Sequence, residues 1–76
     1  MQPYGIFVSY AKDDGTGSWR TVEPMRVQAD SEEEACRAAV LLADFIYAEM
    51  KAEVLVRIIG PDDGRVVGEI RRPISN

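Results

Sequence analysis

The sequence predicts an α+β fold: a ββαββ chain whose four-stranded antiparallel sheet carries one helix packed on one face. Apolar and polar residues alternate near both ends of the chain, with the period of half-buried strands. The middle of the chain is rich in alanine and leucine and opens with a serine cap, which is typical of a helix. Clusters of aspartate, glycine and proline separate the strands of each hairpin. The 76 residues are expected to form a single domain over residues 1–76.

The first hairpin is expected over residues 4–11 and 19–29, joined by a loop at residues 13–18. In the second of these strands the apolar pattern changes phase at Pro24. Because proline cannot donate a hydrogen bond to a ladder, we predict an edge strand with a bulge at that point.

The helix is predicted to begin after Ser31 and to run to about Lys51. Ser31 and Glu34 match a capping box, and the acidic first turn suits the positive end of the helix dipole. At about 100° per residue, one side of the helix collects the apolar residues that are expected to pack on the sheet. These residues are Ala35, Ala39, Leu42, Ala43, Ile46 and Met50.

The second hairpin is expected over residues 53–59 and 65–72, joined by a turn over residues 60–64. Both phases of the first of these strands are apolar, which predicts a central position in the sheet. In the last strand, Val66 is expected to face the core and Val67 to face outward. Placing the third strand beside the first makes every neighbouring pair antiparallel, and this gives the predicted strand order 2-1-3-4.

The composition excludes several kinds of chemistry. Cys36 is the single cysteine and histidine is absent, so neither an intramolecular disulfide nor a zinc site of cysteine and histidine can form. Cys36 is expected on the flank of the buried helix face as an inert small hydrophobe. The glycines near residue 15 lack the spacing and lysine of a phosphate loop, and the aspartate pairs lack the pattern of a calcium loop. We therefore expect no enzyme, no catalytic residue, no cofactor and no metal.

The net charge and the lack of targeting signals limit which partners and which cellular location are expected. The formal net charge of −4 argues against generic attachment to nucleic-acid backbones. The start of the sequence lacks the basic and apolar regions of a signal peptide, and no apolar run approaches the length of a membrane span. We expect a cytoplasmic protein that does not enter a membrane.

One candidate binding surface is the sheet face away from the helix. It is expected to carry Phe7, Ser9, Leu55, Arg57, Ile59, Val67, Glu69 and Arg71. The residues predicted to bind a partner are Phe7, Arg57 and Arg71 on this face and Asp13, Asp14, Asp62 and Asp63 in the neighbouring turns. A mixed apolar and polar face of this kind favours a protein contact, with self-association included. The alternative is a platform for single-stranded nucleic acid built on Phe7, Arg57 and Arg71.

A second candidate surface lies on the helix, whose apolar residues extend beyond one packed face. Leu41, Phe45 and Ala48 are in excess of what a small sheet can cover. Two interpretations stay open for them. The ends of the hairpins, particularly the loop bearing Trp19, cover these residues, or they form a helix-to-helix contact in a homodimer.

The stretch over residues 27–39, which passes from a strand through a serine cap into an alanine-rich helix, looks like a pattern common among small phage and mobile-element proteins. The whole chain resembles some compact ββαββ anti-CRISPR proteins in size, order of elements and acidic balance. The resemblance implies a stoichiometric inhibitor in the host cytosol that occludes a surface of a CRISPR effector, with acidic groups set against the cations that normally hold nucleic acid. It carries over no functional residue, because no motif matches position by position.

The leading hypothesis from the sequence is therefore a non-enzymatic protein-binding module, with a phage-type inhibitor as its narrower form. The alternatives are a nucleic-acid-binding sheet protein and a structural homodimer.

Overall fold

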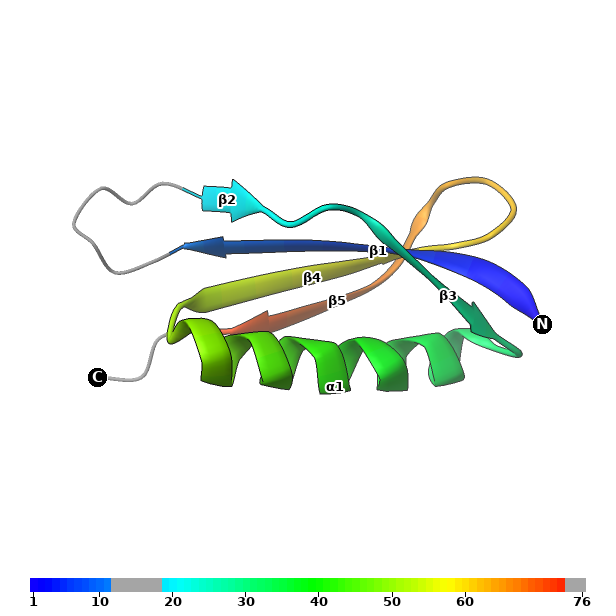
Figure 1. Ribbon diagram of the computed structural model, residues 1–76. Coiled ribbons are helices and arrows are strands. Elements are labelled where there is room, and N and C mark those ends of the chain that lie inside the picture. Colours follow the sequence, from blue (N-terminus) through cyan, green and yellow to red (C-terminus); the bar gives the residue numbers. More distant parts are fainter. Residues whose placement is uncertain (12–18, 74–76) are drawn as a thin grey trace.

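One helix lies along one face of a five-stranded antiparallel sheet in the computed structural model, which describes residues 1–11 and 19–73 (Figure 1). The elements in chain order are β1 (Gln2–Ala11), β2 (Trp19–Thr21), β3 (Met25–Ala29), α1 (Glu32–Met50), β4 (Glu53–Ile59) and β5 (Val66–Arg72). The sheet order is β2-β1-β4-β5, and β3 also pairs with β1. The predicted α+β class is confirmed.

The prediction of four strands is wrong, because residues 19–29 form two strands rather than one. Both pair with β1, so the predicted order 2-1-3-4 is not exact. The break falls at Pro24, where a residue without an N–H interrupts the ladder.

The two short strands are out of register with each other by one residue. Thr21 lies opposite Ser9 and Met25 lies opposite Ile6. The segment from Thr21 to Met25 therefore has one residue more than the segment of β1 from Ile6 to Ser9 that it lies beside. This extra residue has the effect of the bulge expected at Pro24. Val22 packs against the core, so its side chain is on the same face of the sheet as the core residues of β1.

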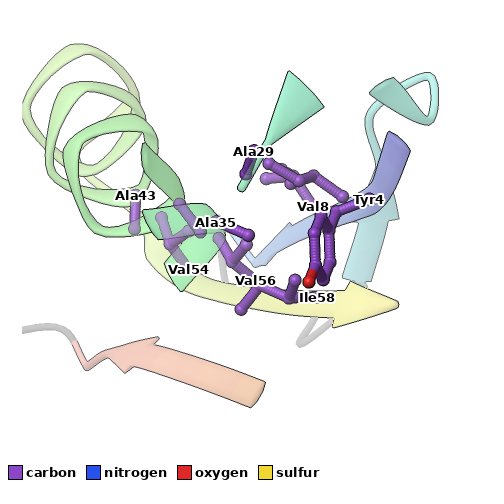
Figure 2. Packing of buried hydrophobic residues seen from close by; sticks show 10 residues of the cluster. Tyr4, Val8, Ala29, Ala35, Ala43, Val54, Val56 and Ile58 are labelled. Atoms are coloured by element: carbon purple, nitrogen blue, oxygen red, sulfur yellow. The ribbon is translucent and has the colours of Figure 1, made fainter. Parts of the chain in front are cut away.

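The core lies between the helix and the two central strands. Val8 lies opposite Val56, and Ile6 lies opposite Ile58, and all four side chains are buried (Figure 2). The helix contributes three small, fully buried side chains to this core, Ala35, Ala39 and Ala43. Leu42 and Ile46 are partly buried at its margin. The predicted packing face of the helix therefore meets the sheet, with alanine at its centre.

Both ends of α1 are fixed by hydrogen bonds, from backbone to side chain at the start and from backbone to backbone at the end. The Ser31 hydroxyl oxygen accepts a hydrogen bond from the N–H of Glu34 at 3.2 Å, and the Glu34 carboxylate accepts one from the N–H of Asp30 at 3.1 Å. Lys51 adopts a left-handed conformation with φ 50, and its N–H donates to the Tyr47 carbonyl at 3.0 Å. The helix start predicted from Ser31 and Glu34 is confirmed.

A second irregularity occurs at the start of β5. Val66 lies opposite Ile59 and Gly68 lies opposite Ile58, so Val67 is an extra residue in the pairing. The expectation for these two valines is therefore wrong. Val67 packs against the core, and Val66 is 50% exposed on the sheet face away from the helix. Because the bulge adds one residue, the side chain before it points to the opposite face from the one that strict alternation predicts.

Gly68 allows the flank of the helix to approach β5. A Cβ atom placed on Gly68 would lie 2.9 Å from the Cys36 sulfur and 3.2 Å from Cδ1 of Ile58. Cys36 is half-buried on this flank, as expected. Within the described residues, no helix is long and apolar enough to cross a membrane.

Replacing Gly68 by alanine is expected to lower the free energy of unfolding by about 1–3 kcal/mol, because the new methyl group overpacks the contact with Cys36. Chemical denaturation of Gly68→Ala, Cys36→Ala and the double variant measures the coupling. The double variant should be less destabilised than the sum of the single variants, because Cys36→Ala removes the obstructing sulfur. Strict additivity would contradict the contact.

Candidate binding surfaces

The sheet face away from α1, here called the open face, collects side chains from every strand. Alternation along the strands and the observed registers place the predicted residues Phe7, Ser9, Leu55, Arg57, Ile59, Glu69 and Arg71 on it. Phe7 lies directly opposite Arg57, and Leu55 lies directly opposite Arg71. The structure therefore brings together the three sheet residues predicted to bind a partner, Phe7, Arg57 and Arg71.

The registers also place on the open face residues that the sequence does not predict there, among them Val66, Trp19, Thr21 and Arg26. Val66 takes the place expected for Val67, because of the bulge in β5. Trp19 and Thr21 join the face because they lie opposite Ala11 and Ser9. Arg26 joins it because it lies opposite Gly5. For Trp19, Thr21 and Arg26 the relevant signal in the sequence is the phase change at Pro24. Which face their side chains occupy, however, depends on how β2 and β3 pair with β1.

Two adjoining hollows lie on the open face. The first has a volume of about 370 Å³ and is lined by Pro3, Gly5, Phe7, Pro24, Met25, Arg26, Ile59, Gly60 and Pro61. The second has a volume of about 300 Å³ and is lined by Phe7, Ser9, Thr21, Leu55, Arg57, Ile59 and Val66. Phe7 and Ile59 border both hollows. Gly5 helps to open the first, since a side chain there would press on Ile59 at 3.3 Å.

Glu69 links two arginines at the β5 side of the open face. The Arg71 Nε donates a hydrogen bond to Glu69 Oε1 at 3.0 Å, and Arg57 Nε lies 3.6 Å from Glu69 Oε2. The hydrogen bond from Arg71, together with the positive charges of Arg71 and Arg57, holds the pKa of the Glu69 carboxyl below its ordinary value of 4.5. One carboxylate thus serves two guanidinium groups.

The open-face side chains of the strands include one more cation than anion, although the whole chain is negative. The cations are Arg26, Arg57 and Arg71, and the anions are Glu69 and Glu53, which lies opposite Ala11. Five further acidic residues lie in α1, three of them in its first turn.

The acidic turn between β4 and β5 adjoins the first hollow through Gly60 and Pro61. Asp63 accepts a hydrogen bond from the N–H of Arg65 at 3.1 Å, and its other oxygen lies 3.7 Å from Arg65 Nε. Its carboxylate therefore stabilises the turn, whereas Asp62 is exposed beside it. The predicted partner-binding residues Asp13 and Asp14 lie outside the described residues.

The second predicted surface, on the helix, is exposed. Leu41 is 70% exposed and Phe45 is 64% exposed, and Ala48 is exposed with them. They lie on the flank away from β5, because Asp44 and Tyr47 hold the other flank. Asp44 accepts a hydrogen bond from Arg72 Nε at 2.7 Å, and the Tyr47 hydroxyl donates to the Pro73 carbonyl at 3.0 Å.

Trp19 does not cover this helix flank. Its register opposite Ala11 places it on the open face, where it is 47% exposed. The described parts of the hairpins leave Leu41 and Phe45 exposed, so they do not provide the expected cover, and residues 12–18 of the loop before Trp19 lie outside the described residues.

Among residues 1–11 and 19–73, no three histidine, cysteine, aspartate or glutamate side chains are grouped so that they could hold a metal ion. Comparisons of the chain with protein-family models, with curated proteins and with solved structures found no match. The two apolar surfaces and their charges are thus the observations on which a function can be argued.

The pairing of Glu69 predicts a pH-dependent part of the stability. Because the folded pKa is depressed, the carboxylate stabilises the fold fully above the ordinary value of 4.5, and this contribution is lost as the pH falls through the folded pKa. Wild type should be more stable than Glu69→Gln at neutral pH, and the gap should close in acid. Thermal unfolding over a pH series measures it.

Arg71→Gln is the matched control for this titration. It removes the largest cause of the depressed pKa of Glu69. The pH-dependent difference in stability between Arg71→Gln and Arg71→Gln/Glu69→Gln should therefore be smaller than the difference between wild type and Glu69→Gln. A gap unchanged by the loss of Arg71 would contradict the assignment.

Proposed function

We propose that this protein is a non-enzymatic binding module that docks on a protein partner through the open face of its sheet. The observation that carries the proposal is the group of apolar residues Phe7, Leu55, Ile59 and Val66 around the two hollows. Arg57 lies among them, opposite Phe7, and Arg71 lies opposite Leu55. Phe7 is 42% exposed and Val66 is 50% exposed, so this group is available to a partner. Exposed apolar and aromatic side chains with arginine among them are typical of protein–protein interfaces.

A protein partner fits this face better than single-stranded nucleic acid does. Stacking platforms need aromatic faces in series, and of Phe7 and Trp19 on the open face only Phe7 lines the hollows, because Trp19 lies opposite Ala11, four residues further along β1. Glu69 also offsets part of the charge of Arg57 and Arg71, which phosphates would require. The aliphatic lining from Leu55, Ile59 and Val66 suits apolar side chains instead.

The narrower form of the proposal is an inhibitor that occludes a basic surface of a CRISPR effector. It rests on the resemblance in size and order of elements and on the exposed Asp62 beside the first hollow. Asp63 contributes less to such a contact, because Arg65 already engages it. The unpaired thiol of Cys36 suits the reducing cytoplasm in which such an inhibitor would act.

Site-specific photocrosslinking tests the binding face. A benzophenone amino acid replaces Phe7 in one variant and Glu33 in the control; the Glu33 side chain is 82% exposed on the helix, away from the open face. After irradiation in a lysate of the source cells, position 7 should give a discrete protein adduct that survives nuclease treatment, and position 33 should not. Loss of the adduct on nuclease treatment would support the nucleic-acid alternative, and no adduct at position 7 would refute the proposal.

A further inference from the structure

Two apolar surfaces of the described chain lack a cover, and they are of complementary kinds. One is the open face of the sheet, and the other is the helix stripe, defined as Ala38, Leu41, Phe45 and Ala48. α1 covers one face of the sheet along the length of the strands (Figure 1), and the apolar residues of the open face have no such cover in the described chain. An antiparallel sheet can leave one face to water, but exposed apolar residues on that face favour a binding partner, and the helix stripe offers apolar side chains to them.

The shapes of the two surfaces correspond. Leu41 and Phe45 stand one helical turn apart, about 5–6 Å between Cβ atoms, and project from the helix as two separate bulky side chains. The open face offers two adjoining hollows that share Phe7 and Ile59 as their common border. The small Ala38 and Ala48 at the ends of the stripe let the helix backbone lie close to the sheet.

The lengths of the elements also correspond. The 19 residues of α1 span about 28 Å, and the 10 residues of β1 span about 33 Å. The open face is therefore long enough to receive the whole helix stripe.

The charges beside the two surfaces are opposite. Glu34 and Glu49 flank the helix stripe at its two ends and are exposed. Of the two cations in or next to the helix, Arg37 is paired with Glu33 at 3.0 Å, and Lys51 is the C-cap residue beyond Ala48. On the open face, the three arginines outnumber the two glutamates. A helix stripe on an open face thus sets carboxylates against guanidinium groups.

Symmetric contacts between like surfaces lack this match. Two helix stripes packed together would bring Glu34 and Glu49 of one copy against the same residues of the other. Two open faces packed together would place the excess positive charge of one face against that of the other. Like charges placed across an interface disfavour both arrangements.

We infer that the open face binds the helix stripe of a second copy of this chain, so that copies associate head to tail. The contact is heterologous, and it leaves one free stripe and one free open face at the ends of every open assembly. The inference rests on the proposed function, because it names the protein partner of the same open face.

Two variants, each of which disables one of the two surfaces, test the contact. Leu41→Lys/Phe45→Lys disables the helix stripe at exposed positions, and Phe7→Glu disables the open face while placing a carboxylate opposite Arg57. Sedimentation is followed over a concentration series, with circular dichroism as the check on folding. If Phe7→Glu is misfolded, Val66→Glu replaces it, since Val66 is half exposed and borders the second hollow.

Wild type should grow in mass with concentration, and each variant alone should remain at the monomer mass of 8.5 kDa. An equimolar mixture of the two variants should form a dimer, because each supplies the surface that the other lacks. A symmetric contact would leave one variant assembling by itself like wild type, and mixing would add no association beyond that, which overturns the inference.

A monomeric wild type at every concentration would also overturn the inference. The proposed function would then still stand if the position 7 adduct contains a different protein, and it would fail if no adduct forms.

Discussion

The close seating of α1 on the sheet is the constraint on which the rest of the structure depends. Ala35, Ala39 and Ala43 are fully buried, so the helix meets β4 and β1 with methyl groups, and the sheet supplies the larger aliphatic side chains (Figure 2). Gly68 continues this close approach on the flank toward β5. A small domain of this kind has a thin core, and its larger helix residues are left to the margins and the outside. The exposure of Leu41 and Phe45 is a direct result.

The same seating explains the character of the open face. Because one helix covers only one side of the sheet, the apolar residues of both phases in β4 cannot all be buried. Val54, Val56 and Ile58 are under α1, whereas Leu55 and Ile59 lie on the other side with Phe7. Arginines and one shared glutamate keep this side hydrated without making it uniformly polar. The two surfaces are thus consequences of one packing arrangement.

Features that depend on local chemistry could be predicted from the sequence. The fold class, the Ser31 cap, the buried helix face and the common side of Phe7, Arg57 and Arg71 follow from periodicity and capping rules. The division at Pro24 was expected as a bulge, but a proline pattern alone does not tell a bulged strand from two strands. The valines at the start of β5 were assigned the wrong way round, because a bulge depends on pairing with β4. The facing of Trp19 and Arg26 likewise depends on the register with β1.

The interruption at Pro24 also bears on how the sheet can grow. An unbroken edge strand is a template on which another chain can add by backbone pairing. Here the edge beside β1 is divided into a strand of three residues and one of five, set out of register by one residue. An incoming strand cannot follow both segments in a single straight ladder. The break therefore protects this edge against fibril-like stacking, and it leaves the faces of the domain, rather than this border, as the places where other molecules are met.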